Sequence, residues 1–196
     1  MKRTCQHPKL LVLIVTAIGI LLDQATKLLV SGLMELGATI PLIEGALHIT
    51  YIQNRGAAFG MLADDRWVFL AVSTVTILGI GLYLCLTKSR DPLYLTSLSM
   101  ILSGGIGNMI DRLALGYVVD FIDFRLIKFA IFNGADSFVC VGAALLFLSV
   151  LLETGRSKND VKNGTTGEEN GDNTEEAPPC DGETGEAPAA EEDTTA

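Results

Sequence analysis

The sequence predicts a membrane protein built from four transmembrane helices that pack as one bundle. Of its 196 residues, 49% are apolar, and they gather in four blocks instead of spreading along the chain. The mean hydropathy is +0.41. A helix rises about 1.5 Å per residue and a hydrocarbon core is roughly 30 Å thick, so each block has a marginal to adequate length for one crossing. Helices are the expected form because lipid offers the backbone no hydrogen bonds.

The four spans are expected at about residues 10–30, 67–86, 93–110 and 135–152. Together they form one transmembrane domain over residues 1–156. Basic residues precede the first block, as they would precede a cleaved signal peptide. The small residues that mark a cleavage site are missing after Leu22. We therefore expect the first block to remain as a transmembrane helix.

Two longer loops, about 31–66 and 111–134, join these spans. In the first loop, Ala46–Gln53 alternates and is rich in β-branched residues, which predicts a short strand. The segment that follows, residues 54–60, contains two glycines and is typical of a turn. We expect a small β-rich segment outside the membrane, lying on one end of an otherwise all-α bundle.

The acidity of the chain belongs to its C-terminal end. The formal net charge is −9, but residues 1–152 hold 11 Lys/Arg and 10 Asp/Glu, whereas residues 153–196 hold 3 and 13. The end lacks aromatic residues and has almost no large aliphatic ones, so residues 157–196 are predicted to be a disordered, solvated tail. No basic stripe with interleaved aromatics appears, which argues against nucleic-acid binding.

The distribution of basic residues predicts the orientation. With four spans, both termini and the short 87–92 turn lie on one side. That side carries more Lys and Arg than the two long loops, which makes the termini cytoplasmic and turns the long loops outward.

Cysteine and histidine patterns predict neither a disulfide framework nor a metal site. The four cysteines, at 5, 85, 140 and 180, form no C-x-x-C pair, and the two histidines, His7 and His48, form no H-E-x-x-H motif. We expect no metal and no other cofactor.

Asp120 and Asp136 are the main candidates for chemistry. Each lies beside an apolar segment, where a carboxylate is costly and marks a functional site, and two close carboxylates can share one proton. The residues alone leave two alternatives open. Asp123 lies three positions after Asp120 and competes with it, and Asp136 could be only a first-turn acid of the fourth helix, with Asn133 as N-cap.

The end of the third span carries a second polar group. On a helix Gly104, Asn108 and Asp111 share a face, so a small residue would permit close packing beside an amide and a carboxylate. Asp111 and Arg112 could equally form an interfacial ion pair.

The first span ends with an acid and a base four residues apart, Asp23 and Lys27. This spacing favours an ion pair on a helix. The pair could belong to a site, or Lys27 could simply extend toward the membrane surface.

Five motifs together resemble the signature of bacterial lipoprotein signal peptidase, also called signal peptidase II. They are Asp23-Gln-Ala-Thr-Lys27, Asn54-Arg-Gly-Ala-Ala-Phe59, Gly104-Gly-Ile-Gly-Asn-Met-Ile-Asp-Arg112, Val119-Asp-Phe121 and Phe132-Asn-Gly-Ala-Asp136. The resemblance covers about residues 10–152. It implies an aspartic endopeptidase of the bacterial inner membrane that cleaves diacylglyceryl-modified prolipoproteins just before the lipidated cysteine.

The resemblance also assigns residues. It implies that Asp120 and Asp136 are the catalytic pair, near the periplasmic face, and it sets Asp123 aside. The residues that it implies bind substrate or support the site are Asp23, Lys27, Asn54, Arg55, Gly104, Asn108, Asp111, Arg112 and Asn133. The expected partners are prolipoprotein substrates and membrane lipids, with the enzyme acting as a monomer.

Two rival functions fit the residues less well. A proton-coupled transporter would carry acids deep within its spans, whereas here they cluster at the outer boundary. A Ser-Lys peptidase could use Lys27 or Lys128 as its base, but no serine has a convincing partner at a fixed spacing.

Overall fold

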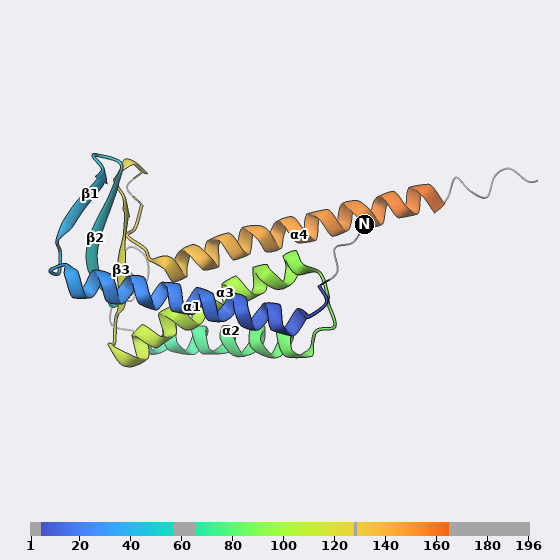
Figure 1. Ribbon diagram of the computed structural model, residues 1–196, viewed down its shortest axis with the longest axis horizontal. Helices are drawn as coiled ribbons and strands as arrows, with labels where there is room; N and C mark the ends of the chain where they lie inside the picture. Colours follow the sequence, from blue (N-terminus) through green and yellow to red (C-terminus); the bar gives the residue numbers. More distant parts are fainter. Residues whose placement is uncertain (1–4, 57–65, 128, 165–196) are drawn as a thin grey trace, which may run out of the picture. The chain divides into compact units, whose positions relative to one another are not determined.

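The computed structural model describes residues 5–56, 66–127 and 129–164 (Figure 1). The chain divides into two compact units, Met1–Arg156 and Ser157–Ala196. The architecture that follows is that of the first unit.

Four helices follow the order of the predicted spans. They are α1 (Pro8–Leu33), α2 (Arg66–Leu86), α3 (Pro92–Ala114) and α4 (Gly134–Gly164). By length and composition α1, α3 and the Gly134–Thr154 part of α4 can each cross a membrane, and α2 holds a shorter apolar stretch, Leu70–Leu86. The chain is therefore a membrane protein with at least three apolar helices in its described part, and the crossing by α2 stays a prediction.

The predicted tail begins too early. Because α4 continues to Gly164, residues 157–164 are helical instead of disordered. Extending an existing helix costs far less than starting one, so a strong apolar helix can carry polar residues beyond its last apolar turn. The rest of the predicted tail, residues 165–196, lies outside the described residues.

Sequence signals explain where α1 and α3 begin. Both helices have proline in the first turn, where the missing N–H is not needed. The Asp91 side chain caps α3 by accepting hydrogen bonds from the backbone N–H groups of Leu93 (2.9 Å) and Tyr94 (3.3 Å). The turn between α2 and α3 is therefore fixed at residues 87–91.

Three antiparallel strands form a sheet in the order β1-β2-β3. The strands are β1 (Thr39–Ile43), β2 (Leu47–Asn54) and β3 (Val118–Phe124). Strand β2 confirms the strand predicted for the first loop. The all-α prediction missed β3 in the second loop, because its side chains are buried on both faces and the apolar alternation of a half-exposed strand is absent.

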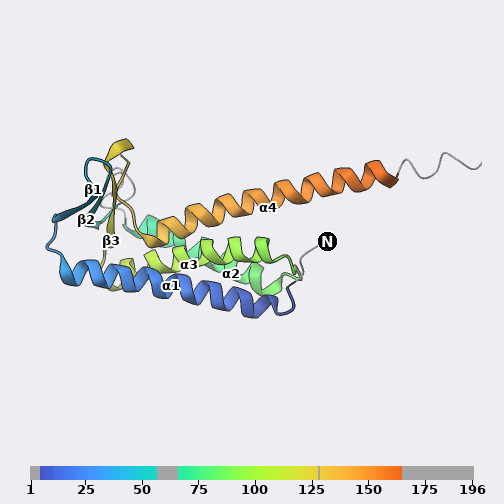
Figure 2. The same ribbon diagram turned by 45° about the horizontal axis from the view of Figure 1, so that its top comes forward.

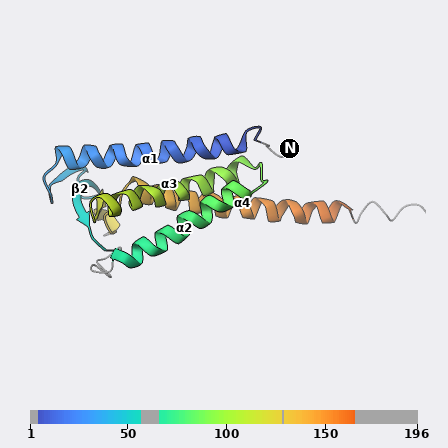
Figure 3. The same ribbon diagram turned by 90° about the horizontal axis from the view of Figure 1, so that it is seen from below.

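The sheet lies at the end of the bundle where α1 and α3 end and α4 begins (Figures 1 and 2). Seen from below, α1 runs beside α3 while α2 crosses α3 at an angle (Figure 3). One buried apolar cluster joins α1 to the sheet through Val30, Tyr51, Val119 and Phe121. The sheet is thus fastened to the helix that carries Lys27.

Small residues let α3 approach its neighbours closely. A Cβ at Gly104 would clash with the backbone oxygen of Ala135 on α4, and one at Gly107 would clash with the Asp23 carboxylate on α1.

Large apolar side chains on the outer helix faces, such as Leu13 and Leu28, are more than half exposed, as expected for surfaces that lie against lipid.

Candidate active site

A buried polar network lies between the helix ends and the sheet. Five of its charged or amide side chains have at most 3% of their surface exposed; they are Asp23, Lys27, Asp111, Asp120 and Asn133. Buried charges are costly unless they are paired and hydrogen-bonded. The partners of each side chain therefore decide what this network can do.

Lys27 of α1 lies at the centre of a group of side chains from α1 and α3. Its ammonium group contacts Asp23 (2.8 Å), Asp111 (3.1 Å) and the side-chain oxygen of Asn108 (2.9 Å). An ammonium has three N–H donors, so these contacts use all of them. The predicted Asp23–Lys27 ion pair is confirmed, and Lys27 does not extend toward the membrane surface.

The two carboxylates that pair with Lys27 also hold backbone segments. Asp23 accepts a hydrogen bond from the backbone N–H of Ala135 in the first turn of α4 (2.8 Å), and Asp111 accepts one from that of Val119 in β3 (3.1 Å). Through them, α1 and α3 fix the starts of α4 and β3. Asp111, for which an ion pair with Arg112 was the alternative, pairs with Lys27.

Gln24 is a member of this network that the sequence prediction did not include. Its amide donates to the carboxylates of Asp23 (3.2 Å) and Asp111 (3.0 Å) and to the backbone oxygen of Gly107 (3.2 Å). Its position directly after Asp23, in the first motif, was the available signal. Its N–H groups stabilise two carboxylates that share a single lysine, by hydrogen bonding and without adding charge.

Asp120 lies in β3 and points into the network. One of its oxygens accepts a hydrogen bond from the Asn54 amide of β2 (2.8 Å), and the other accepts one from the Asn133 amide (2.6 Å). The side chain is 1% exposed. Neighbours from two other segments therefore fix the position of this carboxyl group.

Asp136 lies in the first turn of α4 and is only half-buried. It accepts a hydrogen bond from the Asn108 amide (2.7 Å) and one from the backbone N–H of Asn133 (3.3 Å). Asn133 in return accepts one from the backbone N–H of Asp136 (3.0 Å). This reciprocal arrangement is a capping box, so the predicted cap exists, and Asp136 takes part in the network in addition to it.

Two asparagines connect Asp120 with Asp136. Asn133 donates to Asp120 and also to the side-chain oxygen of Asn108 (3.0 Å), while Asn108 donates to Asp136. The order of side chains is thus Asp120, Asn133, Asn108, Asp136. The two carboxyl groups come from a strand and a helix, β3 and α4, and share this short bridge of amides.

The surroundings of Asp120 favour its protonated form. Burial raises the pKa of Asp120 to about 6, although the hydrogen bond from Asn54 opposes this change. The negative charge of Asp136 raises the pKa as well, while Asn133 and Lys27 lower it. The Asp136 charge therefore reaches Asp120, as expected for two neighbouring carboxyl groups.

Asp123 belongs to a different part of the sheet. Residues three apart in a strand face opposite sides, so Asp123 cannot face the network together with Asp120. Its carboxylate instead accepts hydrogen bonds from Thr50 (2.8 Å) and Arg125 (2.9 Å). Burial acts to raise the pKa of Asp123, but these two partners outweigh it and hold the pKa below its usual range.

The remaining predicted residues differ in their placement. Arg112 donates to the backbone oxygen of Asn108 (3.5 Å), and its charge interacts with the carboxylates of Asp136 and Asp120. Arg55 is exposed after β2, and its charge lies near the ring of Tyr117 instead of in the buried network. Gly104 contributes close packing under the site.

The chemistry of the network is that of acids and amides. Within the described residues, no group of three or more His, Cys, Asp or Glu side chains is placed to hold a metal ion. A Ser-Lys pair involving Lys27 does not fit, because its three donors are occupied. The buried serines of α3 also donate to helix carbonyl groups, as Ser99 does to Leu95 (2.7 Å).

Comparison with known proteins adds an independent observation. The family model described as signal peptidase (SPase) II matches residues 15–152. A lipoprotein signal peptidase of Brevibacillus brevis is 43% identical over 145 residues, which are 74% of this chain and 97% of that protein. One of Bacillus subtilis is 43% identical over 140 residues, 70% of this chain and 91% of that protein.

Solved structures agree with the sequence relatives. A structure described as a bacterial membrane enzyme has a TM-score of 0.71 and 27% sequence identity, over 80% of this chain and 95% of that one. A second structure with the same description has a TM-score of 0.67 over 77% and 97% of the two chains.

Proposed function

Because this chain belongs to the signal peptidase II family, we propose that it removes the signal peptide of lipoprotein precursors with Asp120 and Asp136 as its catalytic pair. Membership in the family makes the chain a membrane peptidase. The proposal adds the residues, the mechanism and the position of cleavage, just before a cysteine that carries a diacylglyceryl group.

One observation carries the proposed mechanism: a bridge of two asparagines joins the Asp120 and Asp136 carboxyl groups, and the charge of one raises the pKa of the other. Peptide hydrolysis needs a base for water and an acid for the carbonyl oxygen and the departing amine. Two carboxyl groups that share one proton supply both functions near neutral pH.

In this mechanism the ionised carboxylate removes a proton from water, and the resulting hydroxide attacks the scissile carbonyl carbon. The protonated carboxyl group donates a hydrogen bond to the carbonyl oxygen as negative charge develops there. The tetrahedral intermediate then collapses, and its C–N bond breaks as a proton passes to the departing nitrogen. The assignment of Asp120 and Asp136 to these two roles is interchangeable.

The amides and Lys27 hold the pair in place. Asn54, Asn108 and Asn133 are uncharged at every ordinary pH and orient three of the four carboxyl oxygens. Dipoles that are already oriented need not reorganise during the reaction. They therefore stabilise the transition state at no further cost in free energy. Lys27 supplies a positive charge that limits how far the pKa of Asp120 rises.

We further propose that the termini are cytoplasmic and that the pair lies near the outer face of the inner membrane. In support, the sheet and the pair lie at one end of the helices, and the start of α1 and the α2–α3 turn lie at the other (Figure 1). That second end carries Lys9, Lys88 and Arg90, as the cytoplasmic side should.

The decisive experiment compares three substitutions in purified, detergent-solubilised protein. Asp120→Asn and Asp136→Asn should each abolish cleavage of a diacylglyceryl-modified prolipoprotein, because an amide can neither accept nor release the required proton. Asp123→Asn, on the opposite face of β3, is the matched control and should remain active. Normal turnover by a folded Asp120→Asn or Asp136→Asn variant would disprove the catalytic pair.

A further inference from the structure

A pocket at the opposite end of the molecule from the acids has no part in the proposed reaction. It has a volume of about 270 Å³ and lies between the start of α1, the end of α2 and the α2–α3 turn. Its lining residues are Pro8, Lys9, Val12, Leu84, Thr87, Lys88, Ser89, Arg90 and Leu95. We call it the basic pocket.

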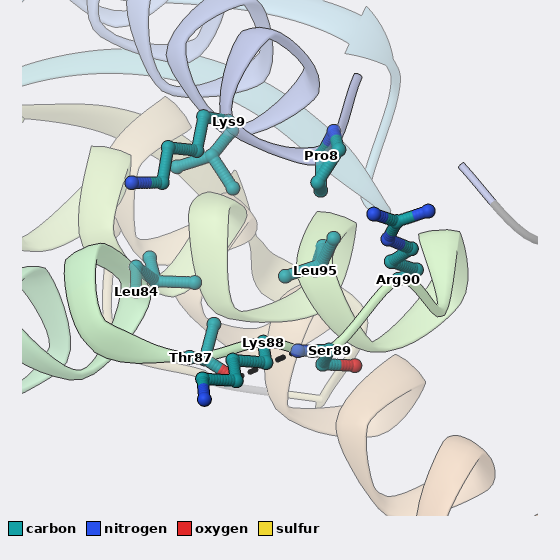
Figure 4. A pocket seen from close by; sticks show the side chains of 9 residues that line it. Pro8, Lys9, Leu84, Thr87, Lys88, Ser89, Arg90 and Leu95 are labelled. Atoms are coloured by element: carbon teal, nitrogen blue, oxygen red, sulfur yellow. Dashed lines mark hydrogen bonds between the residues drawn. The ribbon is translucent and has the colours of Figure 1, made fainter. Parts of the chain in front are cut away.

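Three positive charges surround the basic pocket and no carboxylate lines it. Lys9 comes from α1, while Lys88 and Arg90 come from the turn, and the buried side chains of Leu84 and Leu95 lie between them (Figure 4). Among the described residues, none of the three cations forms an ion pair. The acid next to Arg90, Asp91, already caps α3.

Backbone and hydroxyl groups hold the turn in shape. The backbone N–H of Cys5 donates to the backbone oxygen of Arg90 (2.8 Å), which ties the segment before α1 to the turn. The Thr87 hydroxyl oxygen accepts from the backbone N–H of Ser89 (3.2 Å). The three cations therefore extend from two segments whose separation is fixed.

The surroundings of the pocket favour a ligand that is both anionic and apolar. Large apolar side chains stand exposed on the same helix ends, among them Leu10 (51%) and Leu13 (65%) of α1 and Leu86 (71%) of α2. A soluble anion would use only the charges. A phospholipid would place its phosphate among the cations and its acyl chains along these apolar faces.

We propose that the basic pocket binds the phosphate of an anionic phospholipid headgroup at the membrane surface. Three Lys or Arg residues near a membrane surface contribute roughly fivefold each to such binding, so together they should account for about a hundredfold. The site requires no acid of the buried network, so its success or failure is independent of the proposed reaction.

The test measures retention of phosphatidylglycerol by the full chain in neutral detergent, with native mass spectrometry to count bound lipids. The wild-type protein should retain phosphatidylglycerol in preference to phosphatidylcholine. The variant K9Q/K88Q/R90Q should lose this preference, with affinity reduced about a hundredfold. K9R/K88R/R90K should keep it, because the charges remain. Thermal unfolding in the same detergent verifies that each variant is folded.

Two controls can overturn the proposal. A charge-matched variant, R156Q/K158Q/K162Q, should retain the lipid; an equal loss would mean that net charge, and not the pocket, attracts it. Inorganic phosphate alone should displace little lipid at millimolar concentration. Full displacement by phosphate would show that the site takes a free anion, and undiminished lipid retention by K9Q/K88Q/R90Q would exclude the pocket altogether.

Discussion

Asn133 donates its side-chain amide to the carboxyl group of Asp120 over 2.6 Å, so the residue that caps α4 also fixes an acid of β3. The cap and the site are therefore one structure. A change at this position affects the start of a helix, the bridge to Asn108 and the position of Asp120 together.

The amide of Asn133 can be tested apart from its capping function. Serine is also a good N-cap, so Asn133→Ser should keep α4 folded while removing the donor to Asp120. Misplacing one catalytic group by about 1 Å can cost on the order of a hundredfold in rate, and we expect a loss of that size in kcat. A folded Asn133→Ser variant with normal kcat would mean that the amide serves only as a cap.

Removing the charge of Lys27 should destabilise the protein strongly. Lys27→Met leaves Asp23 and Asp111 buried without their cation, and breaking a buried ion pair from one side costs about 3–5 kcal/mol. The double variant D23N/K27M restores the original balance of charge and should unfold at a higher temperature than Lys27→Met. A double variant that is less stable than Lys27→Met would contradict the charge argument.

Close packing of α3 against α4 predicts that an alanine substitution lowers stability strongly at one glycine and hardly at another. Gly104→Ala would place its Cβ against the backbone of Ala135 and should destabilise the protein by about 1–3 kcal/mol. Gly79→Ala, on α2, meets nothing within 4 Å and should be neutral or slightly stabilising. Thermal unfolding in detergent compares them, and equal effects would disprove close packing at residue 104.

The raised pKa of Asp120 predicts how stability depends on pH. The folded protein releases this proton with a pKa of about 6 and the unfolded chain with one near 3.8, so the folded state binds it more tightly. The contribution of Asp120 to stability is therefore present at low pH and declines as pH rises from about 4 to 6. Asp120→Asn should remove this decline, measured as the difference in Tm from wild type between pH 4 and 7.

The same pKa predicts a change in activity across pH 6. If Asp120 acts as the base, kcat/KM rises up to about pH 6, and if it acts as the acid, kcat/KM falls above it. The direction of the slope shows whether the group that titrates near pH 6 must be ionised or protonated for cleavage. A profile that is flat between pH 5 and 7 would contradict titration of Asp120 in the free enzyme.

Residues beyond the first unit should be dispensable for cleavage. The family model ends at residue 152, and the first unit ends at Arg156. A chain that stops after Arg156 should cleave prolipoprotein at the rate of the full chain. A large loss of turnover in a folded, truncated protein would assign the C-terminal segment a part in the reaction.

Local pattern predicted the helices and β2 but not the sheet as a whole. Apolar blocks are long and continuous, so the bounds of α1 and α3 differ from the prediction by only a few residues. Strand β3 depends on partners about seventy residues earlier, such as Asn54 opposite Val118, and no local period reveals such pairing. For the same reason, the residues alone could not separate Asp120 from Asp123, whereas the two faces of a strand separate them at once.

The site was predictable as a set of residues and not as a network. The resemblance named Asp23, Lys27 and Asp111, but it could not show that one ammonium group joins α1 to α3 through its three donors. Gln24 was missed although it stands inside the first motif, because its three hydrogen-bond acceptors come together only in the folded chain. Arg55 was included through its motif, although it lies outside the buried network.

The order in which the site residues are synthesised determines when the site can form. A ribosome makes α1 with Lys27 first, then Asn54, Asn108 and Asp120, and only at the end Asn133 and Asp136. Until the last helix has entered the membrane, Asp120 lacks the amide of Asn133 and the acid Asp136, although Asn54 is already present. If the proposed pair is the proteolytic centre, a nascent chain holds no complete centre during its own insertion.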